Sequence, residues 1–138
     1  MRLLIDSNIL LDVLMAREEH YMPSYAVWKS CEKGYADGYI SSLTFANIVY
    51  IMRKQLSYDE IDTLMRNMKN AFHFADLTMS ELESAAKMKW RDFEDAIQAE
   101  TASRIHANYI ITRNAKDFAR SPVKAVTQEE YFADIFTA

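Results

Sequence analysis

Residues 2–14 read RLLIDSNILLDVL, and this stretch decides how the chain is expected to fold. A short, mainly apolar run over residues 2–5 ends on Asp6. Runs of this length are typical of buried strands in parallel sheets. The apolar residues that follow recur at helical spacing: Ile9, Leu10, Val13 and Leu14. The stretch therefore predicts a buried strand that passes, through an acidic residue, into a helix over 7–17.

The remainder of the chain repeats this alternation. Further strands are predicted at 38–42, 72–77, 108–114 and 123–126, and helices at 21–34, 43–55, 57–70, 78–89, 92–107 and 128–136. Strands that alternate with helices indicate an α/β domain with a parallel sheet, here of four to five strands. Because the 138 residues include only two Gly and two Pro, no long flexible linker is expected, and residues 1–138 are predicted to form a single domain.

Two of the predicted helices begin with a capping signal. Ser57 is followed three residues later by Glu60, which is the spacing of a capping box. For the helix over 78–89, either Thr78 with Glu81 or Ser80 with Glu83 has the same spacing.

Composition narrows the class of protein. A net charge of −4 and a pI near 5.4 argue against binding nucleic acid through bulk positive charge, but leave room for a nuclease with clustered carboxylates. No apolar segment is long enough for a membrane span, and the N-terminus does not resemble a signal peptide. The single Cys31 is interpreted as a packing residue and fits a reducing compartment, so a cytoplasmic location is expected.

The stretch WRDFEDAIQAE, residues 90–100, places three acids within four positions. One interpretation is structural: Asp92 caps the helix, and Glu94 and Asp95 lie in its first turn, where the helix dipole favours negative charge. The other is a divalent-metal site, because hard cations prefer oxygen ligands. The metal interpretation requires that other acids reach the same place.

Other polar residues follow predicted strands directly. Asp6 ends the first strand, and the fourth is followed by Thr112, Arg113, Asn114 and Asp117. In open α/β sheets, sites form beyond the carboxyl ends of the strands. Together with the acids near Asp95, this placement predicts three acidic positions that converge from distant parts of the chain.

Four blocks in this order resemble the PIN-domain nucleases: LLIDSNILLDVL (3–14), SSLTFANI (41–48), DFEDAIQA (92–99) and YIITRNAKDF (109–118). They look most like the small VapC-like toxin ribonucleases of toxin–antitoxin systems. The resemblance covers essentially the whole chain. It implies a three-layer α/β/α domain with a central parallel sheet.

The resemblance also implies a set of site residues. Asp6, Asp95 and Asp117 match the catalytic acids and, together with Asp92, would bind Mg²⁺ or Mn²⁺. Four residues match supporting positions: Asn8, Asn47, Thr112 and Asn114. Asn114 and Asp117 both fit the fourth acidic position of the family. Arg113 and Lys116 are candidate substrate contacts, although a purely solvated role is the alternative for both.

The implied activity is metal-dependent hydrolysis of RNA phosphodiester bonds, with tRNA, rRNA or mRNA as substrate. Toxin-type relatives form homodimers and bind a small antitoxin protein. A second copy of the chain and an antitoxin are therefore expected as partners here, and no association with a membrane is expected.

One departure from the family pattern keeps other functions open. Most relatives have Glu where this chain has Asn47, and an amide brings no negative charge. A catalytically weak or inactive PIN-fold interaction module is therefore the alternative. A third hypothesis is a phosphoryl-transfer domain with Asp6 as nucleophile. A haloacid-dehalogenase-type phosphatase, however, should have a second Asp at the position of Asn8.

Overall fold

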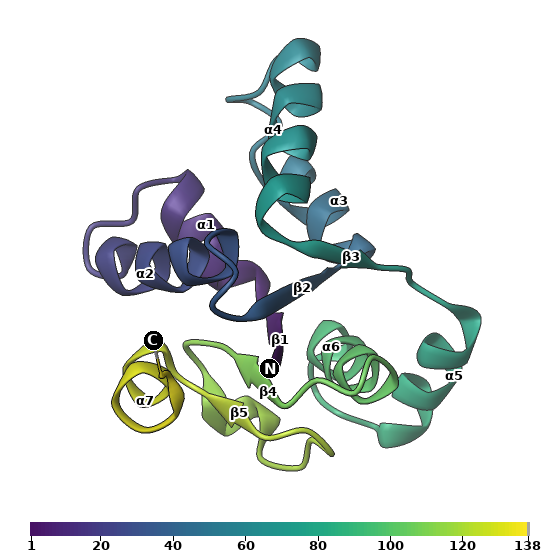
Figure 1. The fold of residues 1–138 in the computed structure, drawn as a ribbon. Helices are drawn as coiled ribbons and strands as arrows, with labels where there is room; N and C mark the ends of the chain where they lie inside the picture. Colours follow the sequence, from purple (N-terminus) through teal and green to yellow (C-terminus); the bar gives the residue numbers. More distant parts are fainter. Residues whose placement is uncertain (138) are drawn as a thin grey trace.

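A computed structural model of the chain describes residues 1–137 (Figure 1). Its centre is one sheet of five strands: β1 (Arg2–Ile5), β2 (Asp37–Ser41), β3 (His73–Ala75), β4 (Tyr109–Ile111) and β5 (Ala125–Val126). The strands lie in the order β3-β2-β1-β4-β5, and every neighbouring pair is parallel. The predicted α/β class and parallel sheet are thus confirmed.

Helices fill the connections between these strands. They are α1 (Ser7–Leu14), α2 (Tyr21–Glu32), α3 (Ser42–Ile51), α4 (Tyr58–Ala71), α5 (Met79–Met88), α6 (Phe93–Arg104), the 3₁₀ turn η1 (Ala115–Phe118) and α7 (Gln128–Glu130), which continues as a π-helical turn, η2 (Tyr131–Ile135). Three predicted helices extended too far, because the helix predicted over 43–55 also ends early, at Ile51. α1 and α6 stop earlier because Ala16 and His106 adopt left-handed backbone conformations, which a right-handed helix cannot continue through.

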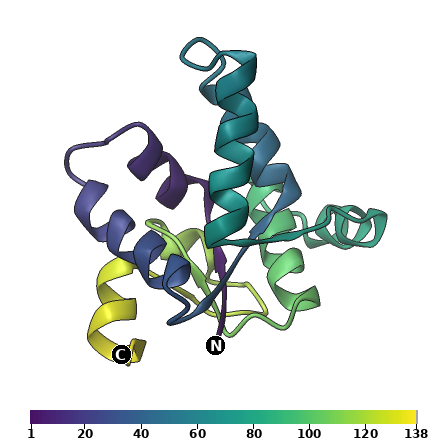
Figure 2. The ribbon, with the colours of Figure 1, turned by 45° about the horizontal axis from the view of Figure 1, so that its top comes forward.

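The side chains of β1 alternate between two hydrophobic cores. Leu3 and Ile5 belong to the core that packs against α1, α2, α3 and α4. Leu4 belongs to the second, where Ala99 and Ala102 of α6 approach the sheet. Figures 1 and 2 show α1 and α2 on one side of β1 and α5 and α6 on the other. The predicted three-layer α/β/α arrangement follows from this period of two.

Capping and close packing fix several helices. The capping box of Ser57 and Glu60 is present on α4. On α5, Thr78 accepts a hydrogen bond from the Glu81 backbone, but the buried Glu81 carboxylate pairs with Arg104 and Thr101 of α6 instead of returning to the cap. Glu81 therefore joins α5 to α6, which a capping pattern alone does not predict.

Gly38 lets α2 lie close against β2. A Cβ atom at this position would be 2.6 Å from the Cys31 sulfur and 2.9 Å from the ring of Phe72. Cys31 is buried, which confirms its predicted packing role, and burial raises the pKa of its thiol to about 12.

Within residues 1–137, no helix has both the length and the apolar composition needed to cross a bilayer.

The strand order locates the place where a site is expected. β1 is the central strand. The chain first adds β2 and β3 next to one edge of β1, and later adds β4 and β5 next to its other edge. The order therefore reverses between β1 and β4, where Ile5 is in register with Ile111. Open α/β sheets form their sites at such switch points, beyond the carboxyl ends of the strands. The next residues in the two strands are Asp6 and Thr112.

Candidate functional site

Asp6 is held rigidly at the end of β1. Its backbone N–H donates to the carbonyl of Ile111 across the sheet, and it is the N-cap of α1. One carboxylate oxygen accepts a 2.9 Å hydrogen bond from the Ser7 backbone, and the other accepts one of 2.9 Å from the Thr112 hydroxyl. The side chain is largely buried, and these two hydrogen bonds, from residues just after β1 and β4, fix the orientation of the carboxylate.

The loop after β4 brings a second acid to this edge. Thr112 is fully buried, and its hydroxyl also accepts a hydrogen bond from the backbone of Asn114. The chain then forms the short turn η1, where the backbone N–H of Asp117 donates to the carbonyl of Asn114. Thr112 therefore links the position of Asp6 to the start of the turn that carries Asp117.

The N-terminus of α6 supplies the remaining acids. Asp92 is the N-cap, and its carboxylate accepts a 3.1 Å hydrogen bond from the Asp95 backbone, as the capping interpretation predicts. Glu94 and Asp95 lie in the first turn, and Glu94 accepts a long, 3.4 Å hydrogen bond from the Ser7 hydroxyl. α6 thus begins beside α1, and its acids face Asp6.

Five carboxylates from three segments line one small pocket of about 150 Å³ at this edge: Asp6, Asp92, Glu94, Asp95 and Asp117. Burial, together with smaller contributions from the charges of Asp92, Asp6, Asp117 and Glu94, raises the pKa of Asp95 to about 7. Burial also raises the pKa of Asp6, with smaller contributions from Glu94 and Asp92, against hydrogen bonds that lower it. The pocket therefore concentrates acidic groups, and no Lys or Arg is among the described residues that line it.

The donor set of the pocket fits a hard divalent cation. Its polar lining offers carboxylate, hydroxyl and amide oxygens, which are the ligands that Mg²⁺ and Mn²⁺ prefer, and no thiol or imidazole. Among residues 1–137, no three acidic, His or Cys side chains are arranged as a ready-made metal cage. The carboxylates that would hold the cation therefore line the pocket without already forming such a cage.

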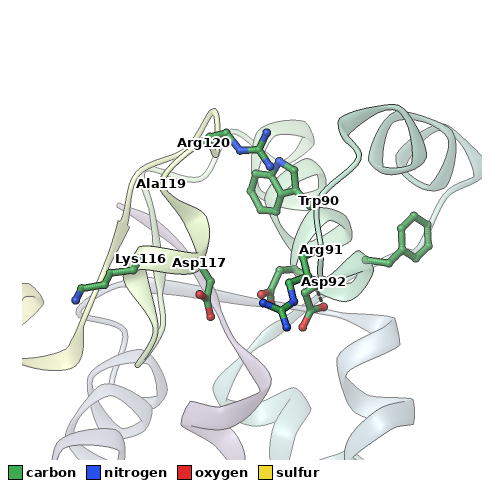
Figure 3. A pocket seen from close by; sticks show the side chains of 9 residues that line it. Trp90, Arg91, Asp92, Lys116, Asp117, Ala119 and Arg120 are labelled. Carbon is green, nitrogen blue, oxygen red and sulfur yellow. Dashed lines mark hydrogen bonds between the residues drawn. The ribbon is translucent and has the colours of Figure 1, made fainter.

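A larger groove of about 740 Å³ adjoins the pocket (Figure 3). Asp92, Asp95 and Asp117 line both cavities. Figure 3 shows Asp117 on one side of the groove, facing Arg91 and Asp92 on the other, with Trp90 and Arg120 farther along. The groove is therefore an open approach to the carboxylates, with basic and aromatic groups on its walls.

The sequence model of the PIN domain family matches residues 2–116. The chain belongs to the PIN domain family. Members of this family are nucleases that generally use a divalent metal ion. The match ends one residue before Asp117, so this last acid lies just beyond it. No curated protein matches the chain.

Solved structures share the PIN fold over nearly the whole chain. VapBC2 from Rickettsia felis, bound to a DNA fragment from its promoter, aligns with a TM-score of 0.69 and 17% identity, covering 92% of this chain and 98% of that one. A toxin–antitoxin complex from Klebsiella pneumoniae aligns with a TM-score of 0.68 and 23% identity, covering 91% of this chain and 96% of that one. VapBC-1 from nontypeable Haemophilus influenzae aligns with a TM-score of 0.69 and 15% identity, covering 94% of this chain and 99% of that one. At these identities, the likeness establishes the fold.

Most of the predicted site residues of this PIN domain meet at the carboxylate pocket. Besides the predicted acids, they are Asn8, Thr112 and Asn114. Asn47 is not among the residues that line it: it lies in the second turn of α3 and is only partly buried. Glu94 and Ser7 line the pocket but were not among the predicted site residues. The crowding of acids in 92–95 was the available signal for Glu94, and Ser7 gave none.

Arg113 is placed differently from the expected substrate contact. Its guanidinium Nε lies 3.2 Å from a carboxylate oxygen of Asp12, in an ion pair without the alignment of a hydrogen bond. Asp12 is fully buried on α1, so its charge attracts the arginine toward the protein interior. Lys116, by contrast, is exposed and lines the groove.

Asp12 is the centre of a buried polar network that the sequence did not reveal. It also accepts a 2.8 Å hydrogen bond from Ser24 of α2 and lies 3.4 Å from Arg17. The Ser24 hydroxyl in turn accepts a 3.0 Å hydrogen bond from Gln128 of α7. The network thus connects α1, α2 and α7 with the loop that follows β4.

Ser24→Ala is expected to lower the free energy of unfolding by about 1–2 kcal/mol, because it removes one of the hydrogen bonds of buried Asp12 and the acceptor of buried Gln128. Denaturant unfolding measures this change. Ser30→Ala is the matched control. Ser30 is buried on the same helix, where its hydroxyl lies beside Tyr131 but, within the described residues, makes no hydrogen bond of good geometry. Equal changes in the two variants would show that the Ser24 hydrogen bonds add no stability.

Proposed function

We propose that this PIN domain, residues 1–138, is a divalent-metal-dependent endoribonuclease that hydrolyses RNA phosphodiester bonds. The observation that supports this most strongly is the convergence of five carboxylates on one pocket at the β1–β4 switch point. Such a concentration of mutually repelling acids, with Asp6 buried and Asp95 partly buried, destabilises a protein, so a charge-neutralising ligand explains its presence better than a structural role does.

Each acid has a role in this proposal. Asp6, Asp95 and Asp117 would hold Mg²⁺ or Mn²⁺, with Asp92 as a further ligand. A bound divalent cation supplies positive charge against the phosphate and lowers the pKa of water. Asp6 has the most firmly held carboxylate of these acids, because Ser7 and Thr112 each donate a hydrogen bond to one of its two oxygens. Asp92 also fixes the start of α6 and thereby the position of Asp95.

The proposed biological role is the toxin of a type II toxin–antitoxin pair in the cytoplasm. The toxin–antitoxin structures with the same fold support this role. Exposed apolar side chains on two helices also support a protein partner. On α2, Met22 is 69% exposed, and on α3 Tyr50 and Ile51 are 65% and 45% exposed. A small antitoxin and a second copy of the chain are the proposed partners.

The purified protein, freed of any partner, is expected to be a homodimer in solution. Light scattering coupled to size-exclusion chromatography should then give twice the 16.0 kDa mass of the chain. The exposed apolar side chains of α2 and of α3 are the candidates for what a second copy would cover. A mass of one chain at high protein concentration would exclude the dimer.

Cleavage of a mixed tRNA and ribosomal RNA pool tests the proposed activity. The protein is incubated with Mn²⁺ or Mg²⁺, and parallel samples contain EDTA or single-stranded DNA in place of RNA. Discrete RNA fragments that disappear with EDTA are expected. Cleavage that persists in EDTA would contradict the metal site, and cleavage of DNA alone would contradict the proposed substrate.

The second candidate function, an inactive interaction module, depends on Asn47. Because Asn47 does not line the carboxylate pocket, Asn47→Glu is expected to change the rate of RNA cleavage by less than about threefold. The measurement is the initial rate on one labelled RNA at fixed Mn²⁺. A gain of tenfold or more would show that a carboxylate at this position reaches the metal and that the natural protein is a weakened enzyme.

A further inference from the structure

We propose that Trp90 forms a base-stacking subsite beside the carboxylates, so that the RNA substrate is unpaired at the cleavage point. This inference rests on the proposed ribonuclease function. It adds a substrate-binding residue, Trp90, and a physical reason why that residue requires an unpaired base. The juxtaposition that supports it is an aromatic ring and basic groups in the groove that opens from the acidic pocket.

The position of Trp90 is fixed by the fold. α5 ends at Met88, and Lys89 takes a left-handed conformation with φ of 57° that turns the chain toward α6. Trp90 is the next residue and lies two positions before Asp92. Its ring meets Phe118 edge-on, with centroids 6.1 Å apart, so the indole is anchored to the turn that carries Asp117. Trp90 is therefore held between the two segments that supply acids to the pocket.

The indole is not fully buried by this packing. Trp90 is only partly buried, and the remainder of its side chain lines the groove. The guanidinium of Arg120 lies over the ring, 5.8 Å from its centroid (Figure 3). Arg120 is itself exposed, so it can move to let a flat base reach the ring. Aromatic faces next to arginine are the typical stacking platform of proteins that bind single strands.

The basic groups of the groove are available for phosphates. Arg91, Lys116 and Arg120 all line it. Across residues 1–137, none of the three has an acidic partner within ion-pair distance, whereas Arg17, Arg104 and Arg113 are paired. In a chain of net charge −4, three cations without carboxylate partners around an acidic pocket provide local attraction for a polyanion.

The indole selects unpaired RNA for a geometric reason. In an A-form duplex each base is stacked between its neighbours, so its face cannot reach a protein side chain. A base in a loop or at an end can turn out and stack on Trp90. The phosphate next to that base then lies toward Asp92, Asp95 and Asp117, which the groove shares with the pocket.

Comparison of Trp90→Phe with Trp90→Leu separates stacking from packing. Both variants keep an apolar side chain against Phe118, but only Phe keeps an aromatic face. Binding is measured with an RNA of about 12 nucleotides, single-stranded or as a duplex, on an Asp95→Asn background that blocks turnover. Trp90→Leu is expected to weaken single-strand binding about tenfold and Trp90→Phe less than threefold. Thermal melts confirm that both variants are folded.

Intrinsic fluorescence gives a direct signal for the contact. Trp28, the only other tryptophan, is buried on α2, so quenching by RNA that disappears in Trp90→Phe arises from Trp90. Arg120→Gln is expected to weaken binding and to reduce its salt dependence by about one phosphate contact. Arg53→Gln is the matched control. Arg53 lies over the ring of Tyr50, 4.1 Å from its centroid, just beyond the C-terminal end of α3, and its loss should leave binding unchanged.

The possible failures are distinguishable. If wild-type protein cleaves RNA but Trp90→Leu binds as tightly as wild type, or duplex RNA binds as well as single-stranded RNA, the stacking subsite is wrong and the ribonuclease stands. If single-stranded RNA quenches Trp90 but no RNA is ever cleaved, the subsite stands and the proposed activity is wrong.

Discussion

Asp6→Asn is expected to reduce metal-dependent RNA cleavage by about a thousandfold or more, while leaving the protein folded. Several kcal/mol of charge stabilisation by a bound cation correspond to rate factors of this size, and Asp6 is the best-oriented ligand of the proposed set. Asparagine has the same shape, and its amide oxygen can still accept the hydrogen bond from the Ser7 backbone. The loss would therefore report the missing charge rather than a collapsed site.

The same substitution should affect stability in the opposite direction. Burial and neighbouring acids raise the pKa of Asp6, so its ionised form destabilises the folded protein at neutral pH in EDTA. Asp6→Asn is thus expected to melt at an equal or higher temperature than wild type when no metal is present, and to gain less stability from Mn²⁺.

Asp37→Asn is the matched control for Asp6→Asn. Asp37 is an exposed acid at the N-terminal end of β2, the sheet edge opposite the pocket. It should retain wild-type cleavage and the wild-type response to Mn²⁺. An Asp6→Asn protein that cleaves at the wild-type rate, or that melts well below wild type in EDTA, would contradict the assigned role of Asp6.

The stability of the metal-free protein is expected to fall as the pH rises from about 4 to about 7. The pKa of Asp95 is raised from 3.8 to about 7 in the folded state. Between these values the folded protein binds more protons than the unfolded chain, so deprotonation favours unfolding. A shift of three units corresponds to about 4 kcal/mol, but Asp95 is partly exposed and shares its shift with four other acids, so about 1–2 kcal/mol is expected.

Denaturant unfolding in EDTA across this pH range measures the effect. Asp95→Asn should flatten the profile, and Asp37→Asn should not. Mn²⁺ should raise the wild-type melting temperature more at about pH 7.5 than at about pH 5, because the cation then competes with fewer protons. A wild-type stability that rises steadily to pH 7 in EDTA would show that the carboxylates do not repel one another in the folded protein.

These expectations depend on contacts of which the sequence revealed only part. The strand at 2–5 and Asp6 at its end could be predicted because a short apolar run followed by an acid is a local pattern. The cap at Asp92 could also be predicted from a local pattern. The free backbone N–H groups of the first helical turn need an acceptor wherever the helix lies, and an Asp at this position supplies one. The direction of Asp95 toward Asp6 could not be derived from that local pattern, since it depends on α6 beginning beside α1.

Arg113 illustrates the limit of a linear pattern. In sequence it is one of several basic residues on a loop after a strand, which is typical of a phosphate contact. In the structure, the fully buried Asp12 draws its guanidinium inward. Asp12 lies among apolar helical residues and would be expected on a solvated face. Only the packing of α2 against α1, with α7 against α2, makes it a buried charge with partners from three other segments.

The sequence by itself determined the alternation of strands and helices, the parallel sheet and the identity of the acids, because each follows from periodicity, capping or residue chemistry over a few neighbouring positions. The tertiary structure decided which of those residues meet. It placed Glu94 and Asp117 with Asp6, left Asn47 out of the pocket, and arranged Trp90 and Arg120 along one groove. The reason is physical: helix packing and strand order set distances between residues up to 111 positions apart, and no local preference of the chain specifies those distances.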